Sequence, residues 1–234
     1  MSTLIEVRGV TKAFRQGDLE VHALRGVDLE VGTGEFTSLA GPSGSGKTTL
    51  LNLLGALDHP TAGTVRLAGN DVSHLGRGDA AEFRLRHVGF IFQAYNLVPV
   101  LSAFENAEFT LLLRGVGAPE RRAVVEPLLE RVGLGEMMKR RPHELSGGQQ
   151  QRVAVVRALA TRPSIVLADE PTANLDSATS EGLLELMAEF NTDLGTTFLF
   201  SSHDPVVLEH ARRVVWLRDG LVEGDERDPE PAAA

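Results

Sequence analysis

The sequence predicts an α/β fold in which helices cover a mostly parallel β-sheet. Apolar runs at residues 165–169 and 197–201 are flanked by polar residues and separated by a helical pattern at residues 177–190. Further upstream, an apolar strand at residues 35–40, a glycine-rich loop and an apolar helix at residues 48–57 follow one another. Strands that alternate with helices are typical of parallel sheets, because each crossover places a helix on one face of the sheet.

The remaining elements form a β-rich start and a mainly helical lobe. Alternation of apolar with polar or small residues predicts half-buried strands at residues 5–10 and 27–31. Short strands at 65–67 and 88–92 and helices at 102–113, 119–132 and 147–159 complete the list. We place the helical lobe at about residues 94–158. The acidic, proline-containing end at residues 225–234 is poor in large apolar groups, and we expect it to be a disordered tail.

Length and composition indicate one globular domain in a reducing compartment. The 234 residues, 42% of them hydrophobic, supply one substantial core and leave little room for a second. The sequence has no cysteine, which excludes a disulfide framework and a thiolate metal site. It also lacks a signal-peptide pattern and any run approaching the roughly 20 apolar residues of a membrane span. We therefore expect a cytoplasmic protein that does not cross the membrane by itself.

The charge balance disfavours some classes of partner. The sequence holds 32 acidic and 23 basic residues, which gives a formal net charge of -9. Nucleic acids and anionic membrane surfaces attract basic proteins, so neither is expected as the main partner. We predict no nucleic-acid binding.

The first chemical motif is a glycine-rich loop between a predicted strand and a predicted helix. Its glycines let backbone N–H groups converge on phosphate oxygens, and the positive end of the following helix faces the same oxygens. Lys47 can reach the β- and γ-phosphates of a nucleoside triphosphate, and the Thr48 hydroxyl can bind Mg²⁺. By itself the segment could be a flexible glycine turn, but its position between strand and helix favours a phosphate site. The motif consists of Gly41, Pro42, Ser43, Gly44, Ser45, Gly46, Lys47, Thr48 and Thr49.

The second motif is a pair of carboxylates, Asp169 and Glu170, at the end of the apolar run 165–169. Adjacent residues of a strand point to opposite sides, so the two carboxylates can serve different tasks. Asp169 can hold the magnesium shell, while Glu170 faces the attacking water as the candidate general base. Standing alone, the pair could equally cap a helix after a core strand. The phosphate loop in the same chain favours the catalytic interpretation.

The third motif is Leu-Ser-Gly-Gly-Gln at residues 145–149, where a helix is predicted to begin. Ser146 could cap this helix, and the N–H groups of Gly147 and Gly148 would form an anion site with Gln149 beside it. By itself the segment could be only a helix start. A second phosphate-binding helix start in so small a chain makes most sense if it serves a nucleotide bound to another subunit.

Together these motifs resemble the ATPase subunits of ATP-binding cassette (ABC) transporters, in which they occur in the same order. The resemblance covers about residues 4–224. It implies a P-loop NTPase (RecA-like) core with a mostly parallel sheet, an N-terminal antiparallel β subdomain and an inserted α-helical subdomain. It also implies an ATPase that binds ATP and Mg²⁺ and forms a head-to-tail homodimer. In that dimer Ser146, Gly148 and Gln149 of one subunit close over ATP held by the phosphate loop of the other.

The family resemblance assigns four further residues to the ATP site. Gln93 matches the glutamine that touches Mg²⁺ and water and links the helical lobe to the core, although it could be simply a polar residue at a strand end. His203 matches the histidine that contacts the γ-phosphate and orients the water with Glu170. Asp176 matches the loop that meets the partner's site. Phe14 matches the aromatic that stacks on adenine, a position where tyrosine is common and where a phenylalanine could instead be core.

A finer resemblance points to the LolD and MacB subgroup. It rests on FQAYNLVP at residues 92–99, SAFEN at 102–106 and ADEPTANLD at 168–176, with Ala173 in place of a glycine often found there. In that subgroup the ATPase sits on the inner face of the cell membrane beneath an integral membrane permease. The permease has four spans and a large extracytoplasmic domain, and the substrates are lipoproteins, macrolides or peptides. We expect the apolar run at residues 95–101 to lie in the groove that receives the permease, although it could instead be core of the helical lobe.

Two alternatives come from other functional classes. A soluble ABC ATPase of DNA repair or translation is disfavoured, because such relatives carry long coiled-coil insertions or two cassettes per chain. A cell-division ATPase of the FtsE type, which signals through a membrane partner without transport, would carry the same motifs. Only the membrane partner separates this second alternative from a transporter.

Overall fold

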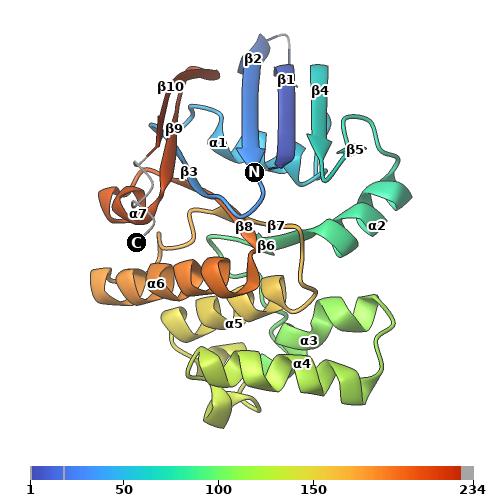
Figure 1. Ribbon diagram of the computed structural model, residues 1–234, viewed down its shortest axis with the longest axis vertical. Coiled ribbons are helices and arrows are strands. Elements are labelled where there is room, and N and C mark those ends of the chain that lie inside the picture. The colour runs from blue at the N-terminus through green and yellow to red at the C-terminus, as the bar shows by residue number, and fades with distance from the viewer. Residues whose placement is uncertain (1, 18, 228–234) are drawn as a thin grey trace.

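Two β-sheets form the frame of the molecule (Figure 1). The computed structural model describes residues 2–17 and 19–227. Within this part of the chain, the first sheet has four strands in the order β2-β1-β4-β5, and its neighbouring strands are antiparallel. Its strands are β1 (Thr3–Gln16), β2 (Leu19–Gly32), β4 (Ala62–Leu67) and β5 (Asn70–Asp71).

The second sheet is mostly parallel, as the sequence predicted. Its six strands in the described residues run in the order β10-β9-β3-β8-β7-β6, and only β9 and β10 pair antiparallel. The strands are β3 (Phe36–Ala40), β6 (Val88–Ile91), β7 (Ile165–Asp169), β8 (Thr197–Ser202), β9 (Arg213–Arg218) and β10 (Leu221–Arg227).

Alternating side chains of this sheet divide the core into two layers. In β7, Ile165 and Leu167 pack on one face, whereas Val166 and Ala168 pack on the other. The first face meets helix α1 (Lys47–Leu54) and the apolar side of the antiparallel sheet. Because both faces are covered, the strand is apolar throughout, which is why its sequence lacks polar alternation.

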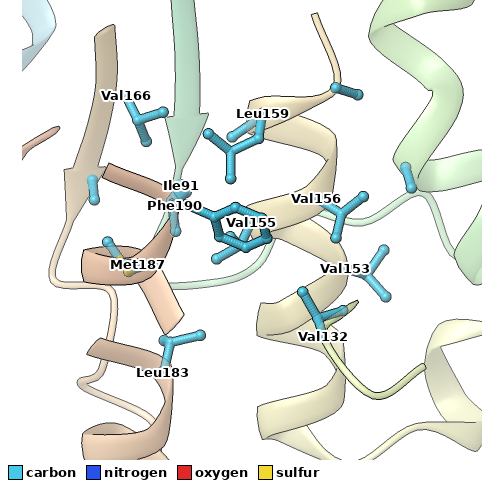
Figure 2. Close-up of a cluster of buried hydrophobic side chains, with 14 of the residues drawn as sticks. Ile91, Val132, Val153, Val155, Val156, Leu159, Val166, Leu183, Met187 and Phe190 are labelled. Atoms are coloured by element: carbon cyan, nitrogen blue, oxygen red, sulfur yellow. The ribbon is translucent and has the colours of Figure 1, made fainter. Parts of the chain in front are cut away.

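Four long helices contribute buried side chains to the core layer on the opposite face. These are α3 (Ala103–Leu113), α4 (Ala118–Arg131), α5 (Gly147–Leu159) and α6 (Ser177–Leu194). Figure 2 shows side chains of α5 and α6 meeting Ile91 of β6 and Val166 of β7 around Phe190. Helices α3 and α4 lie beyond α5, at the end of the molecule opposite the antiparallel sheet (Figure 1).

Several short or polar elements were not predicted from the sequence. They are α2 (Arg77–His87), α7 (Pro205–His210), the 3₁₀ helices η1 (Gly135–Met137) and η2 (Pro142–Glu144), and the strands β5, β9 and β10. In α2 the buried residues are Ala80 and Phe83, so its apolar pattern is weak.

Strand β10 corrects the expected end of the domain. The tail was expected from residue 225, but β10 continues to Arg227 and pairs with β9. Both carboxylate oxygens of Asp225 accept hydrogen bonds from Arg213, at 2.8 and 2.7 Å. Residues 225–227 therefore belong to the core sheet, and the remainder of the expected tail, 228–234, lies outside the described residues.

The buried guanidinium of Arg213 connects β9 to β10, to β2 and to the residue before β3. Besides Asp225 of β10, it donates to the Glu35 carboxylate before β3 and to the carbonyl of Glu30 in β2, each at 2.7 Å. Its side chain is 5% exposed, and that of Glu35 is 12% exposed. A buried charge of this kind is stable only while its partners remain.

Replacing Arg213 by Met should therefore destabilise the fold by about 3 kcal/mol, because the Glu35 carboxylate loses its buried cation and keeps only the exposed Arg227, at 3.5 Å. Urea unfolding followed by circular dichroism measures the change. The matched control is Arg86→Met, which removes an exposed ion pair with Glu82 within α2 and should cost less than about 1 kcal/mol. Equal losses in the two variants would contradict the role of Arg213.

The same pair gives the stability a pH dependence. The hydrogen bonds from Arg213 hold the pKa of Asp225 below its usual range. The unfolded carboxylate then binds a proton at a higher pH than the folded one, so the stabilisation is present above the unfolded pKa of about 3.9 and is lost as the pH falls further. This acid-dependent loss should be smaller in Arg213→Met.

Candidate active site

The phosphate loop follows β3 and ends at the first residue of α1. Gly41 has φ of 141°, and a Cβ atom there would lie 2.0 Å from the carbonyl oxygen of Leu217. At Gly46, with φ of 106°, a Cβ atom would lie 2.6 Å from the carbonyl oxygen of Ala23. Both positions need glycine for backbone conformation and for space, so the loop shape depends on these two residues.

Lys47 is buried at the start of α1, with its ammonium group against the loop. Its Nζ donates to the carbonyl oxygens of Gly41 at 2.7 Å and Pro42 at 3.0 Å. The two carbonyls hold a positive charge beside the N-terminal end of the helix. This is an arrangement suited to binding phosphate.

Asp169 lies at the end of β7 beside the phosphate loop. Its Oδ1 accepts from the Thr48 hydroxyl at 3.0 Å and from the Ser201 hydroxyl at 2.5 Å. One carboxylate and one hydroxyl form the set of oxygen ligands that Mg²⁺ uses when phosphates and water complete its shell. Among the described residues no group of three or more His, Cys, Asp or Glu could hold a metal, so these ligands fit Mg²⁺ and not a cation that needs an all-protein cage.

Glu170 has an uncommon backbone conformation next to Asp169. Its φ is 47°, and its N–H lies 3.1 Å from the carbonyl oxygen of Ser201. Its Oε1 lies 2.8 Å from Nδ1 of His203, a distance at which the ring N–H donates to the carboxylate. The Glu170 side chain is 18% exposed and that of His203 is 68% exposed, so the pair faces the open side of the site.

Most of these residues line one cavity of 590 Å³, and Asp169 lies next to it, hydrogen-bonded to Thr48 of the lining. Its lining includes most of the phosphate loop, together with Gln93, Glu170 and His203 from three other segments. The complete lining is Ala23, Ser43, Gly44, Gly46, Lys47, Thr48, Thr49, Gln93, Glu170, Ala173 and His203. Ser45 lies behind it, buried, with its carbonyl accepting from the N–H of Gly220 at 3.1 Å. The structure thus brings together the predicted phosphate loop, acid and histidine.

The Leu-Ser-Gly-Gly-Gln segment does not line this cavity. Ser146 is the exposed N-cap of α5, where its Oγ accepts from the N–H of Gln149 at 3.3 Å. The Gln149 side chain accepts in return from the N–H of Ser146 at 2.9 Å. Gly147 and Gly148 form the first turn of α5. Within one chain, this helix start is therefore separate from the cavity.

Asp176 and Phe14 also lie outside the cavity lining. Asp176 caps α6 and accepts from the backbone N–H and the hydroxyl of Thr179, at 3.0 and 2.7 Å. These hydrogen bonds hold its pKa below the usual range. Phe14 is an exposed residue of β1, with the ammonium of Lys12 5.0 Å from its ring centroid.

Sequence reasoning missed three residues that shape the site. Ser201 holds Asp169 and Glu170 from the neighbouring strand. Asn174 donates its side-chain amide to the Gln93 carbonyl at 2.8 Å. Ala23 of β2 completes the cavity wall. A serine at the carboxyl end of a strand is a weak signal, whereas an alanine carries none.

This geometry defines a P-loop nucleoside triphosphatase. A phosphate-binding loop joins a parallel strand to a helix, and the ends of two nearby strands of the same sheet supply a magnesium-type carboxylate and an acid paired with histidine. The chain belongs to the ABC transporter family, because the ABC transporter model matches residues 24–173.

Individual relatives narrow the family further. The lipoprotein-releasing system ATP-binding protein LolD of Anaeromyxobacter dehalogenans is 49% identical over 94% of this chain and 93% of its own length. The macrolide export ATP-binding/permease protein MacB of Syntrophobacter fumaroxidans is 48% identical over 94% of this chain, which spans 31% of that protein. The dimeric ATP-binding cassette MJ0796, in a post-hydrolysis state bound to ADP and Pi, has a TM-score of 0.89 and 39% identity, covering 96% of this chain and 98% of that one.

The family and its relatives confirm the predicted class of enzyme. The chain is an ABC-type ATPase of the LolD and MacB type, with the fold that the resemblance implied.

Ser201 gives the most specific prediction about this site. Ser201→Ala removes the hydroxyl that donates to the Asp169 carboxylate and accepts from the backbone N–H of Glu170, so the kcat for ATP hydrolysis should fall by about tenfold. A steady-state phosphate-release assay measures it. The control is Ser38→Ala in the adjacent strand, whose buried hydroxyl has no hydrogen-bond partner among the described residues and whose removal should be nearly neutral. Equal activity of the two variants would refute a positioning role for Ser201.

Proposed function

We propose that two copies of this chain bind two ATP molecules between them and use hydrolysis to drive a separate membrane permease. The observation that carries the proposal is the position of the Leu-Ser-Gly-Gly-Gln segment at an exposed helix start outside the cavity of its own chain. A helix N-terminus with free N–H groups binds anions. In a head-to-tail homodimer, Ser146, Gly148 and Gln149 of one subunit close over the phosphates held by the other. The cassette MJ0796 has been solved as a dimer, which supports this arrangement.

The phosphate loop and Lys47 hold the β- and γ-phosphates of ATP. Thr48 and Asp169 are the ligands we assign to Mg²⁺, since their oxygens lie 3.0 Å apart at the cavity. When bound, Mg²⁺ neutralises part of the phosphate charge and so favours the transition state. Ser201 keeps the Asp169 carboxylate turned toward Thr48.

Glu170 and His203 act on the water. The water oxygen bonds to the γ-phosphorus as the bond from that phosphorus to the β–γ bridging oxygen breaks, which releases ADP and phosphate. Glu170 accepts the water proton, and His203 orients the Glu170 carboxylate and contacts the γ-phosphate. Gln93 faces the same cavity and is assigned to the water and metal shell.

Two assignments depend on parts of the dimer outside one chain. Asp176 begins α6 from an exposed position, which suits a contact with the partner's site. Phe14 is exposed on β1 and does not line the cavity. It can therefore stack on adenine only where the base extends out of the cavity.

An apolar groove beside Gln93 is the proposed seat of the permease. A second cavity, of 250 Å³, is lined by Phe90 and Phe92 around β6 and by Phe109 and Leu113 of α3. Of the run 95–101, which we expected to form this groove, Asn96 contributes to the lining. Leu113 is 60% exposed, so an apolar segment can cover it. Changes at Gln93 would then reach the permease directly.

The whole complex is proposed to export or extract a lipoprotein, peptide or drug-like substrate at the inner face of the cell membrane. The names of the LolD and MacB relatives support this substrate class. No helix of residues 2–17 and 19–227 has the length and apolar character needed to cross a membrane. No nucleic acid is expected as a partner.

The proposal is tested by purifying a tagged Glu170→Gln chain with ATP from native membranes and identifying its partners. We expect a stable ATP-bound dimer together with a four-span membrane protein that has a large extracytoplasmic domain. A partner that moves no substrate and belongs to the division machinery would favour the cell-division alternative. Recovery of only soluble proteins or nucleic acid would contradict the membrane role.

A matched pair of variants makes this test specific for the groove. In the Glu170→Gln chain, Leu113→Glu places a carboxylate on the groove lining, whereas Leu112→Glu changes the neighbouring exposed leucine, which does not line the groove. Leu113→Glu should lose the membrane protein and keep the ATP dimer. Leu112→Glu should keep both. Equal recovery from the two variants would remove the groove from the proposal.

A further inference from the structure

Arg157 carries a half-buried charge that the hydrolytic mechanism does not use. It lies near the end of α5, the helix that begins at Ser146. In the described part of the chain its guanidinium forms no ion pair, and its hydrogen-bond acceptors are the backbone carbonyls of Tyr95 at 2.9 Å and Asn96 at 2.5 Å. Burial lowers the pKa of Arg157. A half-buried cation that donates to two neighbouring carbonyls fixes their positions, which points to a role in shaping that segment.

The two carbonyls belong to a strained turn that directly follows Gln93. Tyr95 has φ of 58° and Asn96 has φ of 49°, so two consecutive residues other than glycine adopt the left-handed conformation. Such residues are strained and persist only where the surroundings fix them. The two hydrogen bonds from Arg157 are such a constraint.

The same turn is fixed to α5 and to the core at other points. The hydroxyl of Tyr95 lies at the start of α5, where a Cβ atom on Gly147 would be 2.8 Å from it. Strand β6 approaches α5 so closely that a Cβ atom on Gly89 would lie 2.5 Å from the carbonyl oxygen of Ala158. On the other side, Asn174, from the loop after Glu170, holds the carbonyl of Gln93. Gln93 is thus linked to α5 through the turn that follows it, and to the segment that carries the candidate base through Asn174.

From these contacts we propose that Arg157 is a positioning residue for ATP hydrolysis. It fixes the Tyr95–Asn96 turn to α5 and thereby places the Gln93 side chain in the cavity. The helix that presents Ser146 at one end then sets the geometry of Gln93 from its other end. This inference rests on the proposed role of Gln93 in hydrolysis.

A double-mutant cycle of Arg157→Met and Gln93→Ala tests the inference by steady-state ATP hydrolysis. Arg157→Met alone should lower kcat by about tenfold and change KM by less than about twofold, because Gln93 is misplaced while the phosphate loop is intact. In the Gln93→Ala background the same substitution should lower kcat by less than about twofold, since its effect passes through Gln93. Equal reductions in both backgrounds would overturn the proposal.

Arg152→Met is the matched control on the same helix. Arg152 also donates to a carbonyl, that of Val132 at 3.1 Å, but it lies away from the turn. Its kcat should equal that of the unmodified chain. A second readout is hydrogen exchange: the amides of residues 93–97 should exchange faster in Arg157→Met and be unchanged in Arg152→Met. If Arg157→Met does not fold, Arg157→Gln keeps a donor toward one carbonyl and should give a smaller reduction in kcat in the same cycle.

The outcomes separate this inference from the proposed function. Full activity of Gln93→Ala alone would contradict the role assigned to Gln93. A large loss in Gln93→Ala combined with additive effects of Arg157→Met would leave that role intact and reject only the positioning by Arg157.

Discussion

The Asp169 carboxylate is the contact on which the site depends. It accepts hydrogen bonds from the hydroxyls of Thr48 in α1 and Ser201 in β8. These bonds connect the helix after the phosphate loop to two parallel strands. The parallel order β3-β8-β7 brings their carboxyl ends to one edge, where each strand delivers a different group. The charge of Asp169 is tolerated there because two hydroxyls donate hydrogen bonds to the carboxylate and the cavity opens beside it. The sheet order therefore determines which residues can meet at the phosphates.

Three residues with strained backbones lie near this contact, and one anion-binding motif of the chain lies away from it. Glu170, Tyr95 and Asn96 hold left-handed conformations in the two segments that flank the cavity. The Leu-Ser-Gly-Gly-Gln segment, in contrast, begins α5 with a relaxed capping box and an exposed Ser146. The candidate base and the phosphate loop come from one chain, and the start of α5 lies outside their cavity. This arrangement is suited to a site assembled from two copies. Such a site can couple the bound nucleotide to subunit contacts.

The local motifs were predictable, and the long-range contacts were not. The phosphate loop, Asp169, Glu170 and His203 follow apolar strands, and their residue types state their chemistry. Ser201 and Asn174 act on residues 32 and 81 positions away, through a hydroxyl or amide that could serve anywhere on a surface. Strand β9 escaped prediction because Arg213 occupies one of its buried positions. The segment 225–227 was expected to be a tail because all three residues are charged, and the sequence does not show that Asp225 pairs with Arg213.

The mass of the Glu170→Gln chain in the presence of ATP tests the central claim, that each site is completed by a second copy. Light scattering during size exclusion should give twice the 25.2 kDa of one chain with ATP, and the mass of one chain without it. Adding Ser146→Arg places a bulky cation at the exposed helix start and should leave a monomer that still binds ATP. A monomer with ATP in the Glu170→Gln chain, or an unchanged dimer in the double variant, would contradict the account.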